Sequence, residues 1–121
     1  MSSAEIRKKI EELKQALADF ENQVQKSLFK YNSVISKINS INSTIGDSKD
    51  TLIVKSISDT NQKITNKTSN LISTINSEKS RIVDKIKARI AELEIEEKIV
   101  FQREQEELQK KNSSNDSQSE N

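Results

Sequence analysis

Apolar residues recur at alternating intervals of three and four along the first third of the chain, and this rhythm constrains the fold most strongly. Such spacing places apolar side chains on one face of an α-helix. The chain has no proline and a single glycine, Gly46, so the rhythm predicts an uninterrupted helix over about residues 3–45. Ser2 followed by Glu5 fits a capping box at its start. The predicted apolar face comprises Ile6, Ile10, Leu13, Leu17, Phe20, Val24, Leu28, Tyr31, Ile35, Ile38, Ile41 and Ile45.

The rhythm breaks at residues 46–48, which predicts a tight turn between two antiparallel helices. Gly46 is expected to adopt the left-handed conformation that ends many helices. Asp47 or Ser48 is then expected to cap the second helix, because both side chains accept hydrogen bonds from free backbone amides. Asp50 would fall in the first turn of that helix, where a carboxylate is favourable.

A second, weaker rhythm predicts a helix over about residues 49–110. Asn61 and Lys79 fall where apolar residues are expected, and such polar positions fix the register of paired helices at a cost in stability. The predicted apolar face comprises Ile53, Ile57, Ile64, Thr68, Leu71, Ile75, Ile82, Ile86, Ile90, Leu93, Val100 and Leu108.

The two rhythms together predict an all-α fold, an antiparallel two-helix hairpin of coiled-coil type over residues 1–111. The second helix is longer than the first, so its end near residues 99–108 is expected to lack an intramolecular partner. Residues 112–121 contain no apolar side chain and are expected to form a disordered tail.

The low apolar content predicts a thin core. Only 31% of the residues are hydrophobic and 3% aromatic, whereas compact domains approach one half apolar. A seam between two helices buries too little apolar surface to offset easily the entropy of ordering the chain. We therefore expect the working form to be an oligomer or a complex with another protein.

Composition also excludes several classes of function. The chain has no cysteine and no histidine, so we expect no enzyme, no metal site and no cofactor. A formal net charge of +1 argues against nucleic-acid binding. The absence of a long apolar run argues against membrane insertion and against a signal peptide. We expect a cytoplasmic location, with export without a cleavable signal peptide as an alternative.

Two charged clusters in the second helix are expected to form solvated faces and ion pairs rather than binding sites. The carboxylates have no histidine beside them, which argues against metal. The cations are expected to pair within the helix and with glutamates of the first helix. The carboxylates are Glu92, Glu94, Glu96 and Glu97, and the cations are Lys79, Arg81, Lys85, Lys87 and Arg89.

Apolar residues away from the predicted seam are the candidate protein-binding residues, because exposed apolar groups mark interfaces. Phe29 and Val34 lie off the seam of the first helix, and Ile95, Ile99 and Phe101 lie off that of the second. Among these, the cluster over residues 95–101 gives the clearest signal.

Two helices joined at Gly46, with a Lys-, Ile-, Asn- and Ser-rich composition, resemble the small WXG proteins of type VII secretion. The resemblance is closer to the short helical partners of LXG toxins, because the turn reads Thr44-Ile45-Gly46 without the family's tryptophan. The chain also lacks the family's export pattern, in which an acidic residue lies four positions after an aromatic residue, because Gln105 lies four positions after Phe101.

The resemblance implies a targeting factor or chaperone that packs along the N-terminal helical domain of a toxin, with a second small helical protein as a further partner. One alternative is a prefoldin-like chaperone subunit with a β-hairpin near residues 51–60. Another is a structural coiled coil that forms homo-oligomers.

Overall fold

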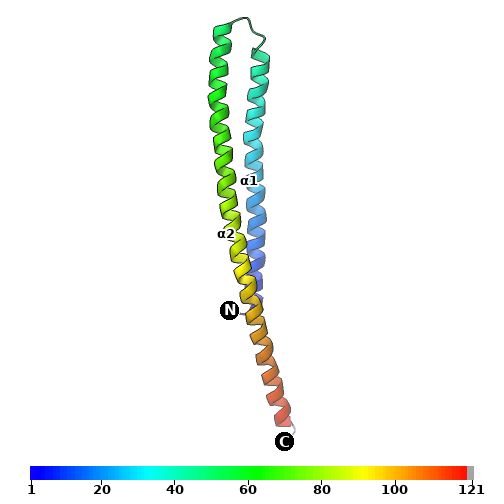
Figure 1. Cartoon of the computed structure of the whole chain (residues 1–121). Helices are drawn as coiled ribbons and strands as arrows, with labels where there is room; N and C mark the ends of the chain where they lie inside the picture. The colour runs from blue at the N-terminus through cyan, green and yellow to red at the C-terminus, as the bar shows by residue number, and fades with distance from the viewer. Residues whose placement is uncertain (120–121) are drawn as a thin grey trace. The chain divides into compact units, whose positions relative to one another are not determined.

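A computed structural model describes the backbone of residues 1–119 and the side chains of residues 1–113. It consists of two antiparallel helices, α1 (Ser3–Ile45) and α2 (Thr51–Ser119), joined by a short turn (Figure 1). The predicted all-α helical hairpin with a longer second helix is therefore confirmed. Packing divides the chain into unit 1 (Met1–Ala18 with Val83–Asn121) and unit 2 (Asp19–Ile82). In each unit, α1 and α2 meet along a line that we call the seam.

The first helix has the predicted bounds and the predicted cap. The backbone amide of Glu5 donates to Ser2 Oγ at 3.2 Å, and the amide of Ile6 donates to the Ser2 carbonyl at 3.0 Å. Ser2 is therefore the N-cap, satisfying an amide that the first turn leaves unpaired.

The turn differs from the prediction. None of the described residues, Gly46 included, has a positive φ. The Gly46 amide instead donates to the carbonyl of Asn42 at 3.0 Å and continues the helical pattern, and the Ser48 amide closes a turn on the Ile45 carbonyl at 2.8 Å. A hydrogen-bonded turn of type I needs no left-handed residue, which explains why glycine's freedom is not used here.

The cap of α2 is also different, because Asp50 takes the place expected for Asp47 or Ser48. Asp50 Oδ1 accepts the amide of Ile53 at 3.1 Å, and its carbonyl accepts the amide of Val54 at 3.0 Å. The helix consequently begins at Thr51 rather than near residue 49. Ser48 has a supporting role, since its Oγ accepts the amide of Asp50 at 3.3 Å.

Unit 1 contains a compact apolar core at its seam. Ile6 and Ile10 of α1 pack with Ile90 and Leu93 of α2, and Leu93 is only 2% exposed. Leu13, Ile86 and Val100 pack against this cluster. Burying each such side chain contributes roughly 1.5–3 kcal/mol, so these contacts dominate the stability of the unit.

Unit 2 has a more polar seam. Its buried residues within the described part of the chain are Ile38, at 6% exposed, and Asn61, at 8%. The Asn61 Nδ2 donates to Asn42 Oδ1 at 2.7 Å. Asn42 therefore faces α2 at the place predicted for Ile41, because the buried amide of Asn61 is satisfied only when the two asparagines meet. Ile41 is 47% exposed as a result.

The same shift appears along α2 of unit 2. The sequence predicts Ile53, Ile64 and Leu71 at the seam, but they are 54%, 41% and 45% exposed. The seam contains the residues that directly follow them, Val54, Thr65 and Ile72, which are all partly buried. Asn61 confirms the prediction of a polar seam position, and Lys79 is likewise partly buried.

The end of α2 has more contacts than predicted. Val100 packs on the core of unit 1, and Glu104 accepts hydrogen bonds from Ser3, so the stretch without a partner begins after Glu104. Every described side chain over residues 105–113 is exposed. The backbone remains helical to Ser119, beyond the predicted end near residue 110. The tail predicted over residues 112–121 falls mostly outside the described side chains.

The prefoldin-like alternative predicts a β-hairpin near residues 51–60. This segment is helical in the structure, and no strand occurs among residues 1–119. Its β-branched residues are accommodated because the Asp50 cap starts a helix that packs against α1.

Candidate functional site

The five predicted protein-binding residues are all exposed, but they do not form one surface. In unit 2, Phe29 is 75% exposed and Val34 is 40% exposed, and they lie on different sides of α1. In unit 1, Ile95 and Ile99 are 62% and 47% exposed and share one side of α2. Phe101 is 45% exposed and lies on another side of the same helix.

Ile95 and Ile99 continue an exposed stripe on the side of α2 that faces away from α1. Ala88 and Ala91 precede them at intervals of three and four, and all four residues are exposed. Ile95 lies two residues after the buried Leu93, about 200° around the helix from it. We call these four residues the outer stripe; small residues at one end and larger ones at the other would let a second helix approach closely.

Ion pairs join the two helices of unit 1 across the seam. Arg7 Nε lies 3.0 Å from Glu97 Oε1, and Lys14 Nζ lies 3.9 Å from Glu94 Oε1. The side chains involved are largely exposed, apart from Glu97, so each pair contributes about 1 kcal/mol or less. They help to set the register of the helices more than their stability.

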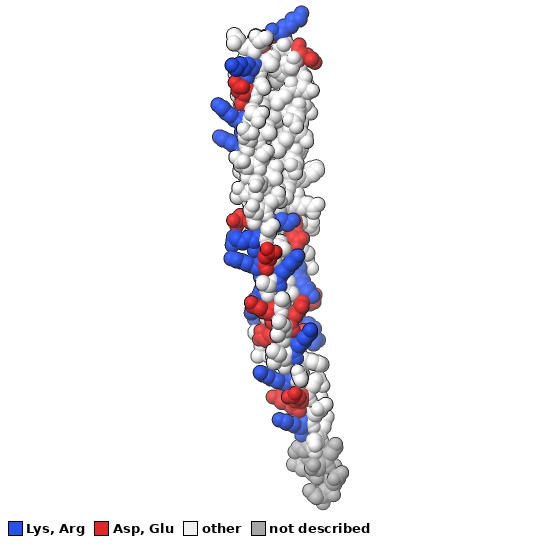
Figure 2. Space-filling model, in the orientation of Figure 1, with Lys and Arg blue, Asp and Glu red and all other residues white. Residues whose placement is uncertain are grey.

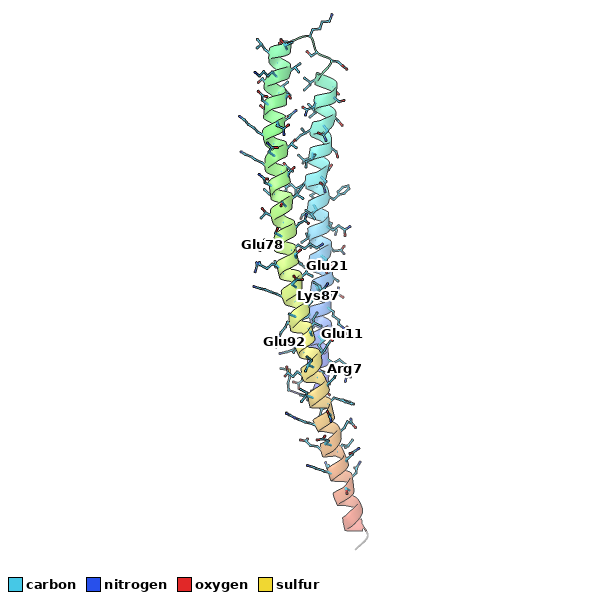
Figure 3. All side chains as sticks on the ribbon, viewed as in Figure 1. Arg7, Glu11, Glu21, Glu78, Lys87 and Glu92 are labelled. Carbon is cyan, nitrogen blue, oxygen red and sulfur yellow. The ribbon has the colours of Figure 1, made fainter. Side chains whose placement is uncertain are left out.

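Two members of the basic cluster of α2 form ion pairs within their own helix. Arg81 contacts Glu78 at 2.7 Å and Arg89 contacts Glu92 at 3.1 Å, each three residues apart. The cross-helix pairs predicted for this cluster form in the opposite sense, with cations on α1 and acids on α2. Figure 3 shows both signs of charge on each helix, with Arg7 and Glu11 on α1 and Lys87 and Glu92 on α2.

Glu104 caps the start of α1 from the other helix. The Ser3 amide donates to Glu104 Oε1 at 2.8 Å, and the Ser3 hydroxyl donates to Oε2 at 2.6 Å. These two hydrogen bonds lower the pKa of Glu104 below its ordinary value of 4.5. Desolvation opposes them, and the positive charges of Arg7 and the amino terminus add smaller effects in the lowering direction. The helix N-terminus favours the same charged form.

Unit 2 contains a second group of exposed apolar residues, which occupy equivalent positions next to the seam on both of its helices. Val34 and Ile41 on α1, and Ile64 and Leu71 on α2, each directly precede a seam residue. Within each helix the two residues are seven positions apart, which is about two turns. Their exposed fractions are similar, at 40%, 47%, 41% and 45%, so about half of each side chain is covered.

These four residues lie on one broad side of unit 2, which we call the apolar face. A two-fold axis normal to the plane of an antiparallel pair relates its helices, so equivalent positions lie on the same side of the seam. The hydrogen bond between Asn42 and Asn61 fixes the register and brings Ile41 level with Ile64 to within about one turn. The other two residues meet in the same way two turns further along.

The other side of the seam is polar and uncharged. Five exposed residues on that side carry amide or hydroxyl groups, and each directly follows a seam residue: Asn32, Asn39, Gln62, Ser69 and Asn76. In Figure 2, one face of unit 2 is white over most of its length, whereas blue and red side chains are interspersed over unit 1. The apolar face therefore has a chemically distinct counterpart across the same two helices.

Sequence reasoning identified Val34 but missed its three companions. The sequence predicts Ile41, Ile64 and Leu71 at the seam because they continue the intervals of three and four along each helix. The signal that finds the group is the spacing of seven residues that its members share within each helix.

Searches for a metal site, for a membrane-spanning helix and for similar proteins found nothing over the described residues. No group of three or more acidic side chains is placed to hold a metal ion over the described range. No helix within that range contains a stretch apolar enough to cross a membrane. Comparisons with protein-family models, with curated proteins and with solved structures gave no match.

Proposed function

We propose that this chain is a helical binding partner, acting as a targeting factor or chaperone, of a larger secreted protein such as an LXG toxin of type VII secretion. The outer stripe of Ala88, Ala91, Ile95 and Ile99 is the observation that supports it. These apolar side chains point away from the seam and are exposed in the isolated chain. A helix of a partner that covered them would gain about 25 cal/mol for each Å² of apolar surface removed from water.

The chemistry of the described side chains suits binding better than catalysis. Several of its ionisable groups are in ion pairs at the surface, and Glu104, whose pKa is lowered by its hydrogen bonds with Ser3, caps a helix. A helix that offers an apolar stripe along one side is a common means of recognising another helix. The proposed action is to cover apolar stripes of the toxin's helical domain before export.

Co-expression with the N-terminal helical domain of a toxin encoded beside this chain tests the proposal. We expect the two proteins to purify as one complex, and replacement of Ile95 and Ile99 by glutamate to release the toxin domain. Leu108→Glu is the matched control, because Leu108 is 53% exposed on the same helix but lies outside the outer stripe. Sedimentation of the isolated chain separates the alternative, since a stable homo-oligomer that Ile95→Glu dissociates would assign the stripe to a second copy.

A further inference from the structure

We infer that the apolar face of unit 2 binds an amphipathic helix of another protein, one that carries aspartate or glutamate beside its own apolar stripe. The inference rests on the proposed function, because it takes the occupant to be a helical partner. It adds to that function a second docking surface, formed by Val34, Ile41, Ile64 and Leu71. It also specifies that the partner segment bound there is acidic.

The geometry of this face matches a helix. Its residues recur every seven positions on both α1 and α2, which is the repeat that a third helix packed along the pair would share. Exposed fractions of 40–47%, at positions that directly precede seam residues, place the side chains at the edges of the seam, where they retain surface for a partner. A third helix packed along this face would contact both helices of the unit at each level.

The charges around the face select the partner. Over residues 22–46 and 60–77, lysine is the only charged residue. Lys30, Lys37 and Lys67 lie three or four residues from members of the apolar face, on the same side of their helices. None of them forms an ion pair within the described part of the chain. An acidic helix would pair with these cations, whereas the same face of a second copy of this chain would bring lysine against lysine.

A lipid surface fits the same face less well. An interfacial apolar group inserts by protruding from its helix into the bilayer. The most exposed apolar side chains of unit 2 in the described part are Phe29, at 75%, and Leu52, at 80%, and neither belongs to the apolar face. The side chains of the apolar face are about half covered, which suits a helix that packs its own side chains against them.

A pair of synthetic helices provides the test. Each peptide has four heptads with isoleucine and leucine at its apolar positions, and the flanking positions are all glutamate in one and all lysine in the other. Fluorescence anisotropy with the full-length chain should show binding of the glutamate peptide, and binding of the lysine peptide weaker by about tenfold or more. Failure of the glutamate peptide to bind, or equal binding of both peptides, overturns the inference.

Variants then locate the surface. Leu71→Gln should weaken binding of the glutamate peptide about tenfold or more, whereas Leu52→Gln should leave it unchanged. Lys37→Glu alters no seam contact, so it should weaken the glutamate peptide and strengthen the lysine peptide even if Leu71→Gln perturbs folding. Weakening by Leu52→Gln equal to that by Leu71→Gln, or no effect of Lys37→Glu, would contradict the assignment.

Two further measurements identify a different occupant. Binding to phosphatidylglycerol vesicles that Leu71→Gln abolishes would assign the face to lipid and overturn the inference. A sedimenting dimer that Leu71→Gln dissociates would assign it to a second copy, with the same consequence.

The same variants separate this inference from the proposed function. If the toxin domain co-purifies with the Leu71→Gln and Lys37→Glu variants but not with the Ile95→Glu variant, the proposed function stands and this inference fails. If no toxin domain binds the unaltered chain, the proposed function fails, and the peptide measurements still decide whether the apolar face takes an acidic helix.

Discussion

The two units are built from the same two helices but fill their seams differently. Unit 1 buries Ile6, Ile10, Ile90 and Leu93 in one cluster, whereas the buried apolar side chain of unit 2 within the described residues is Ile38. The difference does not come from a lack of apolar residues in unit 2. Its isoleucines and leucines are divided between the seam and the apolar face, and asparagine and threonine occupy several seam positions.

The comparison shows that apolar content and burial are separate properties of a helix pair. Unit 1 uses its apolar residues to hold its helices together and surrounds them with ion pairs. Unit 2 uses a hydrogen-bonded asparagine pair to set its register and keeps apolar side chains half exposed. We therefore expect unit 1 to contribute most of the stability of the isolated chain, and unit 2 to gain stability when a partner binds.

The largest expected effect separates the two cores directly. Leu93→Ala removes a side chain that is 2% exposed and should lower the free energy of unfolding by about 2–5 kcal/mol. The matched change Leu71→Ala, at a residue 45% exposed, should cost about 1 kcal/mol or less. Urea unfolding followed by circular dichroism measures both, and equal losses would remove the distinction between the units.

The asparagine pair gives the next largest effect. Asn42→Ala leaves the buried amide of Asn61 without its partner and should cost about 1–3 kcal/mol. Replacing both residues by leucine should be neutral or stabilising, because no buried polar group is then left unpaired. Denaturant unfolding of the single and double variants measures these changes in the free energy of unfolding. A double variant less stable than Asn42→Ala would contradict the assignment of the loss to an unpaired buried amide.

A smaller effect is expected at the turn that closes unit 2. Because Gly46 has no positive φ, Gly46→Ala should change the free energy of unfolding by about 1 kcal/mol or less. The added Cβ would lie 3.3 Å from the carbonyl oxygen of Asn42, which requires only a small adjustment. A left-handed Gly46 would instead lose about 1–2 kcal/mol on the same change, so a thermal melt of this variant tests the turn geometry.

The smallest and most local effect is expected at the contact between Ser3 and Glu104 in unit 1. The pKa of Glu104 is lowered in the folded state, so its stabilising effect is present above its ordinary value of 4.5 and is lost as pH falls through the folded-state value. Hydrogen exchange should show the protection of the Ser3 amide falling in that acidic range. Glu104→Gln should remove this pH dependence and Glu107→Gln should not; protection that is independent of pH in the unaltered chain would contradict the assignment.

Much of the fold follows from local sequence. The rhythm of apolar residues predicts α1 with its observed bounds, and Ser2 caps it as expected, because both depend on interactions within a few residues. The position of the turn follows in the same way, since one break in the rhythm leaves one place where the chain reverses. The cap at Asp50 was missed because several adjacent residues have side chains able to accept the same amides.

The sequence by itself determined that two helices form, where the chain turns and which apolar residues lie off the seam at Phe29, Ile95, Ile99 and Phe101. Only the tertiary structure decided that Asn42, Thr65 and Ile72, rather than the residues before them, face the seam of unit 2, and with this the apolar face. The physical reason is that Asn61 forms its hydrogen bond with a residue 19 positions away, and satisfying that buried amide outweighs burying Ile41 and Ile64 more completely.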